Sequence, residues 1–134
     1  MNEDFLAEGV ELTHILVVSD FEQGKVFYRD VLGATLVNEY GGTSAVFNFQ
    51  GAWLLVVTGG EPTADKPDVV FAPPADPNRV SHSMTIRVPD CQKAYDILKT
   101  RGVQFLTPPY NWGPEIRCFF RDPDGHLFEI SQLT

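Results

Sequence analysis

The sequence predicts an α+β domain built from two β-α-β-β-β repeats, and two observations support this fold class. Residues 12–37 and residues 81–106 share one pattern: an apolar strand, an aspartate, a helical stretch that ends at glycine, and a second strand. The two stretches start about 70 residues apart, which is close to half the chain. Because neither repeat alone has enough apolar side chains for a full core, we expect them to pack into one domain over residues 1–134.

The first repeat is expected over about residues 10–58. A run rich in β-branched residues at 14–18 predicts the first strand. Ser19 and Glu22 have the spacing of a capping box, which predicts the start of a helix, and Gly33 has the position of its left-handed C-terminal cap. The remaining strands are predicted near residues 34–39, 44–50 and 52–58.

The second repeat is expected over about residues 81–133, with the same order of elements. Asp90 has the position of the helix N-cap, and Gly102 has that of the C-terminal stop. Asp122-Pro-Asp-Gly125 predicts a tight turn, because proline presets φ and glycine accepts positive φ. This turn puts His126 at a hairpin tip, where we expect a surface residue. Strands after the helix are predicted near residues 104–106, 116–121 and 126–131.

The segment between the repeats, about residues 59–80, is predicted to be an irregular linker. It holds five of the ten prolines in the chain, so it suits neither a helix nor a central strand. One interpretation is a stiff crossover between the repeats. The other is that the apolar segment 69–71 covers the mouth of a cavity as a lid.

Composition and charge restrict the possible partners. The chain of 134 residues has 18 acidic and 10 basic side chains, and its formal net charge is −8. An acidic chain without a basic cluster is a poor candidate for binding nucleic acid or an anionic membrane surface. No signal-peptide pattern and no apolar run near the ~20 residues of a membrane span are found, so the expected location is the cytoplasm. Cys91 and Cys118 are expected to be reduced and packed.

Two motifs carry a resemblance to a known family. Phe27-Tyr-Arg-Asp-Val-Leu-Gly33 ends the first helix, and Arg121-Asp-Pro-Asp-Gly-His-Leu-Phe-Glu129 runs into the last strand. With the repeated β-α-β-β-β unit, these motifs resemble the vicinal oxygen chelate superfamily, which includes glyoxalases, bleomycin resistance proteins and ring-cleaving dioxygenases. The resemblance covers about residues 10–133. It implies a cupped mixed sheet with helices on the outer face, a cavity for a small-molecule ligand, and a homodimer.

The resemblance also implies a metal site in the cup. Metal-dependent members take ligands from the first and the last strand of each repeat, which here points to His14, His82 and Glu129, with Glu129 also as the catalytic residue. Leu55 occupies the fourth position and cannot bind a metal. Two histidines and one carboxylate suit Fe2+, Mn2+ or Zn2+. Such a metal would chelate vicinal oxygens of a substrate for lyase, isomerase or dioxygenase chemistry.

The register of the first strands favours an alternative. Seven residues before the aspartate that opens each helix, where the family pattern places the histidine, lie Thr13 and Ser83. Because side chains alternate between the two faces of a strand, His14 and His82 would then point toward the helix layer, unless a β-bulge restores them. The alternative function is therefore a metal-free protein that sequesters an aromatic compound, as bleomycin resistance proteins do.

Four side chains are candidates for contacting the ligand. Arg117 on a predicted cup strand has the planar fork that binds anionic groups, and pairing with an acidic residue is the alternative. Trp53 is an aromatic residue on a cup strand of the first repeat. Tyr110 and Trp112 belong to a proline-bounded loop, residues 107–114, and loops on a rigid scaffold often carry recognition.

Overall fold

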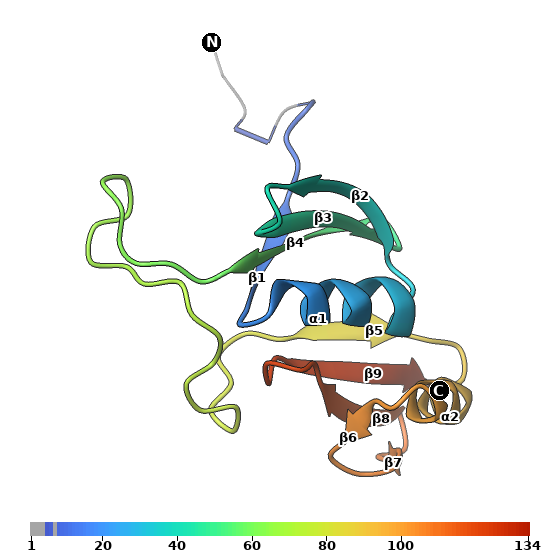
Figure 1. Cartoon of the computed structure of the whole chain (residues 1–134). Helices are drawn as coiled ribbons and strands as arrows, with labels where there is room; N and C mark the ends of the chain where they lie inside the picture. Colours follow the sequence, from blue (N-terminus) through green and yellow to red (C-terminus); the bar gives the residue numbers. More distant parts are fainter. Residues whose placement is uncertain (1–4, 7) are drawn as a thin grey trace.

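The computed structural model describes residues 5, 6 and 8–134, and it shows two β-sheets joined by a long linker (Figure 1). Each sheet belongs to one β-α-β-β-β repeat, so the predicted α+β fold is confirmed. In this described part of the chain, no helix is long and apolar enough to cross a membrane.

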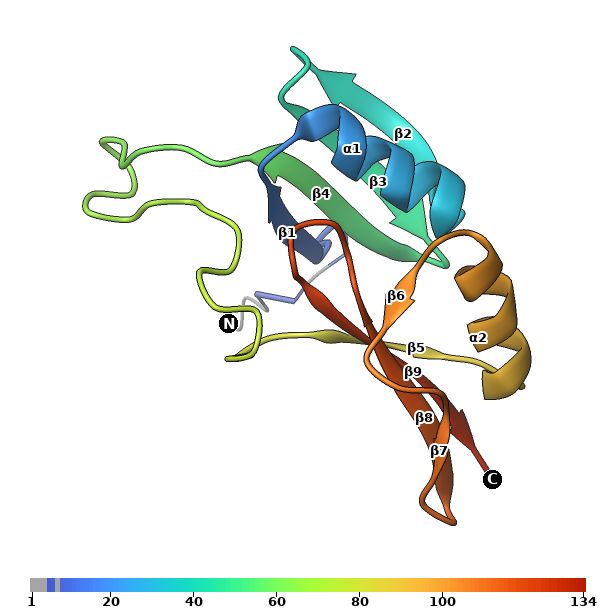
Figure 2. The same cartoon turned by 60° about the horizontal axis from the view of Figure 1, so that its bottom comes forward.

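The first repeat forms a four-stranded sheet in the order β1-β4-β3-β2. β1 pairs with β4 in parallel, and the other two pairings are antiparallel. The helical crossover after β1 lies against one face of this sheet (Figure 2). The elements are β1 (Thr13–Val18), α1 (Phe21–Val26), the π-helical turn η1 (Phe27–Val31), β2 (Thr35–Tyr40), β3 (Ser44–Phe49) and β4 (Ala52–Thr58).

The second repeat forms a five-stranded sheet in the order β5-β9-β8-β6, with a short strand, β7, also paired to β8. β5 pairs with β9 in parallel, and β8 pairs with β9 in antiparallel. β7 lies within the segment that the sequence predicts as a loop. The elements are β5 (Met84–Arg87), α2 (Cys91–Thr100), β6 (Gln104–Phe105), β7 (Tyr110–Asn111), β8 (Glu115–Arg121) and β9 (Leu127–Leu133).

The first helix begins one residue later than the capping-box pattern predicts. Asp20 is the N-cap, and its Oδ1 accepts a hydrogen bond of 3.0 Å from the N–H of Gln23. The N–H of Ser19 donates instead to Oδ1 of Asp124, at 2.9 Å. The predicted capping box is therefore wrong, because the carboxylate at the next position caps the helix while Ser19 contacts the other repeat. Gly33, with φ of 81°, ends the helical segment as expected.

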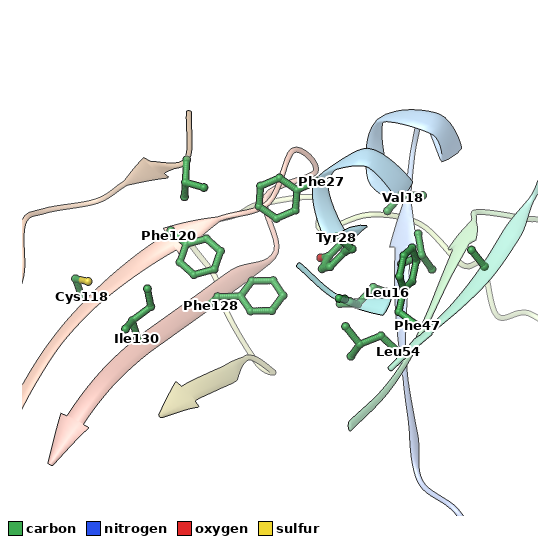
Figure 3. Packing of buried hydrophobic residues seen from close by; sticks show 14 of the residues in the cluster. Leu16, Val18, Phe27, Tyr28, Phe47, Leu54, Cys118, Phe120, Phe128 and Ile130 are labelled. Carbon is green, nitrogen blue, oxygen red and sulfur yellow. The ribbon is translucent and has the colours of Figure 1, made fainter. Parts of the chain in front are cut away.

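The inner faces of the two sheets meet at one shared core (Figure 3). Tyr28 lies between them: its ring centroid is 6.3 Å from that of Phe47 on β3 and 6.1 Å from that of Phe128 on β9. Phe120 on β8 stacks on Phe128 with a centroid distance of 5.1 Å. All four side chains are fully buried. Because both inner faces turn toward this core, the other face of each sheet points away from it.

A hydrogen-bond network at the turn before β9 joins the two repeats. Oδ2 of Asp122 accepts from the Tyr28 hydroxyl at 2.6 Å, and Oδ1 accepts from the N–H groups of Asp124 and His126 at 2.9 and 2.8 Å. Nε2 of His126 lies 2.7 Å from the carbonyl oxygen of Val17 on β1. His126 is therefore half-buried against the other repeat, and the prediction that it lies on the surface is wrong.

The linker between β4 and β5 contains no helix or strand among its described residues and has only isolated bridges. Its first part projects away from both sheets (Figures 1 and 2). Val69 and Val70 are exposed there, and they line neither of the pockets described below. Residues 72–83 border a pocket instead, so the structure favours a crossover over a lid formed by residues 69–71.

Candidate functional site

The face of the first sheet that points away from the core is apolar over β1 and β4 and becomes polar toward β2. On β1 and β4 every second side chain is buried, as Leu16 and Leu54 are, and the side chains between them point the other way. Ile15 on this face is 50% exposed. We call this surface the first open face; it consists of Thr13, Ile15, Val17, Val46, Trp53, Leu55 and Val57, bordered on the β2 side by Thr35, Asn38, Tyr40, Ser44 and Asn48.

The corresponding face of the second sheet is polar and charged. Strand alternation puts Cys118, Phe120 and Ile130 in the core and their neighbours on the other side. The register then places Thr85 beside Glu129. We call this surface the second open face; it consists of Thr85, Arg87, Glu115, Arg117, Phe119, Arg121, Leu127, Glu129, Ser131 and Leu133.

Glu129 lies in the middle of the second open face, and both of its carboxylate oxygens have partners. Oε1 accepts a hydrogen bond of 2.7 Å from the Thr85 hydroxyl, and Oε2 lies 3.6 Å from Nη1 of Arg117. The side chain is 14% exposed. The negative charge of Glu129 is thus matched by neighbours in its own sheet.

The guanidinium group of Arg117 contacts carboxylates at its edge and aromatic rings at its planar face. Nη1 lies 3.8 Å from Oε1 of Glu115 in addition to its contact with Glu129. The guanidinium carbon lies 5.5 Å from the ring centroid of Trp112 and 5.3 Å from that of Phe119. Cation–π contacts of this kind fix the orientation of the planar group. The geometry therefore favours the acidic-partner alternative for Arg117 over binding an anionic ligand group.

Arg87 and Glu115 on the second open face also pair with each other. Nη1 of Arg87 lies 3.5 Å from Oε2 of Glu115 and donates a hydrogen bond to the Ser131 hydroxyl, which donates to Glu115. Arg121 is the third arginine on this side of β8, and it donates a hydrogen bond to Asn78, so three arginines and two glutamates give this face a formal charge of +1. Glu115 and Ser131 were not predicted from the sequence. Both lie an even number of residues from Glu129 on the same hairpin, and this spacing predicts that they share its face.

Tyr110 and Trp112 form an exposed aromatic rim beside the second open face. They are 57% and 58% exposed, and their ring centroids are 4.7 Å apart. β7 pairs Tyr110 with Arg117, and Gly113, with φ of 101°, makes the turn into β8. The structure thus brings together three of the four predicted ligand-contacting residues. Trp53 lies apart from them, on the first open face.

The two predicted metal-binding histidines lie together: His14 is on the core side of β1, whereas His82 precedes β5, and Glu129 is on the other side of its sheet. His14 is paired in register with Leu54, whose side chain is in the core, and it lines a pocket with Leu54 and Phe128. The ring of His82 lies 5.7 Å from that of His14, with the planes 29° apart. Among the described residues, no group of three or more His, Cys, Asp or Glu side chains is arranged to hold a metal ion.

The donor set therefore does not fit the metal site that the resemblance implies. β1 pairs with β4 without interruption from Thr13 to Val18, so no β-bulge turns His14 toward the first open face. The side chain that β1 presents beside Trp53 on that face is Thr13. A second copy of the chain that packed against the first open face would not contact the ring of His14, because that ring lies on the inner side of β1.

The two cysteines form a buried pair beneath the second sheet. Their Sγ atoms are 3.8 Å apart, and both thiols are free, as the sequence predicts. Burial raises the pKa of the Cys118 thiol to about 12 and also raises the pKa of Cys91. Because a buried, protonated thiol is a poor nucleophile, neither cysteine is a candidate for covalent catalysis.

Comparisons with known proteins agree with the fold and the motifs. The model of the Glyoxalase/Bleomycin resistance protein/Dioxygenase superfamily matches residues 11–130. Metallothiol transferase FosB of Lysinibacillus sphaericus (strain C3-41) is 31% identical over 126 residues, which cover 92% of this chain and 82% of that protein.

Two solved structures share the fold. FosX, the fosfomycin resistance protein from Listeria monocytogenes, has a TM-score of 0.66 at 19% identity and covers 96% of both chains. TioX from Micromonospora sp. ML1 has a TM-score of 0.69 at 19% identity, over 94% of this chain and 100% of that one. The chain therefore belongs to the glyoxalase/bleomycin resistance protein/dioxygenase superfamily.

Proposed function

We propose that this protein binds a planar small molecule in a site that needs no metal ion. The observation that carries the proposal is the position of the histidines. His14 lies on the inner side of β1 with the ring of His82 beside it, whereas Glu129 lies on the second open face with Thr85 and Arg117 as partners. The open faces instead offer a ligand an apolar surface over β1 and β4, a polar surface whose glutamates are paired with arginines, and an aromatic rim.

The chemistry of these surfaces favours a planar ligand that is neutral or cationic. Tyr110 and Trp112 are exposed rings on which a flat molecule can stack, and a stacked aromatic pair contributes about 0.5–1.5 kcal/mol beyond the area it buries. Arg117 is already paired with two carboxylates, so it attracts an anionic group only weakly. The chain as a whole carries a formal charge of −8, which disfavours anions further.

The complete site requires two chains. The open faces point away from one shared core, so a single chain presents two half-sites and leaves apolar side chains such as Ile15 exposed. In a two-fold dimer, the first open face of one chain meets the second open face of the other, which forms two equivalent sites. Light scattering should therefore give the mass of a dimer at micromolar concentration. A monomer that binds the ligand with full affinity would contradict this arrangement.

Fluorescence titration of chelator-treated protein tests the proposal. The probes are 9-aminoacridine, a planar cation, and anthracene-9-carboxylate, a planar anion of similar size. We expect the cation to bind more tightly. Trp112→Ala should weaken its binding about five- to tenfold, because one stacking surface is lost. Ile97→Ala removes an apolar side chain that is 40% exposed on α2, outside both open faces, and it should leave the affinity unchanged. Equal affinities in the two variants would refute the proposed role of the rim.

A second candidate, a metal-dependent transferase, is favoured by the 31% identity to a metallothiol transferase. This candidate requires His14, His82 and Glu129 to surround one Fe2+, Mn2+ or Zn2+ ion, and hence a one-residue change of register in β1 together with a different path of the segment before β5. Plasma mass spectrometry decides between the two candidates. About one metal ion per chain after desalting, lost in both Glu129→Gln and His82→Ala, would establish the second and contradict the first. We expect no retained metal in any of the three proteins.

A further inference from the structure

A pocket of about 540 Å³ lies at the junction of the two repeats. One side is formed by residues 15–17 of β1, which is an edge strand of the first sheet. Another is formed by residues 125–128, at the start of β9. The third is formed by residues 72–83 of the linker and the approach to β5, which run past this junction in Figure 2. We call this space the junction pocket.

The linker side of the junction pocket is fixed by specific contacts with the second repeat. Nη2 of Arg121 donates a hydrogen bond of 2.6 Å to Oδ1 of Asn78. Pro77 packs so closely on Gly125 that a Cβ at that glycine would lie 3.0 Å from the Cβ of Pro77. The turn closes on itself, because the N–H of Arg79 donates to the carbonyl oxygen of Asp76 at 3.0 Å. These contacts fix the segment against the second repeat, so it forms a stable wall of the pocket. The first part of the linker, which projects away from both sheets, does not.

The lining of the junction pocket combines an apolar side with a cation. Ile15, Val17 and Val80 supply apolar contacts, and Arg79 brings a guanidinium group to the same space. Among the described residues, no carboxylate lies within ion-pair distance of Arg79. The one acidic side chain in the lining is that of Asp76, and its Oδ1 accepts the N–H of Asn78 within the turn.

The lining of the junction pocket also contains hydrogen-bond donors. Ser81 and Ser83 contribute hydroxyl groups to the lining, and the rings of His82 and His126 complete its polar part. Nε2 of His126 is fixed by its contact with the carbonyl oxygen of Val17. An arginine in a pocket that also contains hydroxyl donors is suited to an oxyanion, because its planar fork can donate two parallel hydrogen bonds.

We propose that the junction pocket binds a small amphipathic anion, with its oxyanion at Arg79 and its apolar part against Ile15, Val17 and Val80. This is a second site, which borders the planar-ligand site between chains and shares two residues with it. Ile15 and Val17 also belong to the first open face, but Arg79 and Val80 do not. Substitutions of Arg79 and Val80 therefore test the junction pocket alone.

Two matched fluorescent probes separate the anionic contribution from the apolar one. 8-Anilinonaphthalene-1-sulfonate carries a sulfonate, and N-phenyl-1-naphthylamine is the same aromatic amine without it. We expect wild-type protein to bind the sulfonate at least about tenfold more tightly than the neutral probe, because a charge-assisted hydrogen bond is lost without the sulfonate. Arg79→Gln should remove this preference and leave the neutral probe unaffected. Arg29→Gln, which changes an exposed arginine paired with Asp30, should alter neither affinity.

Val80→Asp provides a second test with little risk to folding, because Val80 is 46% exposed. A carboxylate there should abolish sulfonate binding by repulsion and loss of apolar contact, while Trp112→Ala should leave sulfonate binding intact. Near-UV circular dichroism verifies the fold of each variant. Sulfonate binding that persists in Arg79→Gln and Val80→Asp would overturn the proposal, as would an equal loss in Arg29→Gln. Failure of the planar-cation titration would instead affect only the site between chains.

Discussion

The Tyr28 hydroxyl is predicted to be a large single contribution to the stability of the two-repeat fold. Tyr28→Phe removes the donor that lies 2.6 Å from Oδ2 of Asp122, in a place where both side chains are buried. The backbone N–H groups of residues 124 and 126 serve the other oxygen, so Oδ2 would lose its side-chain donor. A hydrogen bond to a charged group contributes about 1.5–3 kcal/mol, and the structure supports a loss of about 2 kcal/mol. For a chain of this length, that corresponds to a decrease in Tm of roughly 8 °C.

The loss of folding stability caused by Tyr28→Phe should depend on pH. Burial raises the pKa of Asp122 above its ordinary value, and the hydrogen bond from Tyr28 opposes this rise. A carboxyl whose pKa is higher in the folded chain binds more protons when folded, so its contribution to stability falls as pH rises through that pKa. Without the hydroxyl the pKa of Asp122 rises further, and the difference between variant and wild type is largest where the carboxyl is ionised. The difference should therefore shrink as pH falls through the folded pKa.

Urea denaturation at about pH 7.5 and about pH 4 measures both effects. Tyr40→Phe is the matched control, because the Tyr40 hydroxyl accepts only an exposed hydrogen bond from Asn38. The control should lose less than about 0.5 kcal/mol at either pH. A loss for Tyr28→Phe as small as that of the control, or a loss that grows toward acid pH, would refute the reasoning.

Three further outcomes follow from the core and the turns. Phe128→Ala should cost about 3–5 kcal/mol in urea denaturation, because it opens a cavity where both sheets meet. Gly125→Ala should cost about 1–3 kcal/mol, because φ is 96° and the new Cβ would press on Pro77; a thermal melt unchanged from wild type would contradict this. In native protein, a disulfide thiol reagent should leave the Cys118 thiol unmodified until denaturant is added, and rapid labelling would show that the pair is accessible.

The fold was predictable because its signals are local. The two repeats are marked by alternation in the strands, by Asp20 and Asp90 at the helix starts, and by Gly33 and Gly102 at the helix ends. The predicted start of the first helix is wrong by one residue, because a serine and an aspartate are adjacent there and both residue types are common N-caps. β7, with only two residues, is too short for its pattern to be read.

The candidate site was predictable only in part. Counting back from each helix start indicated that His14 would face the helix layer, and the pairing of His14 with Leu54 agrees with that count. Local patterns do not show how two sheets meet. The burial of His126 against β1 and the shared position of Tyr28 depend on contacts between residues about a hundred positions apart in sequence, which no short-range pattern encodes.

The opposite orientation of the two open faces has a consequence for mixed assemblies. In the proposed dimer, each site combines the first open face of one chain with the second open face of the other. A chain with Trp53→Ala and a chain with Trp112→Ala would each form dimers in which both sites are damaged. A mixed dimer of the two would contain one site with both changes and one site with neither. Two defective variants should therefore complement each other and regain up to half of the wild-type binding capacity per dimer.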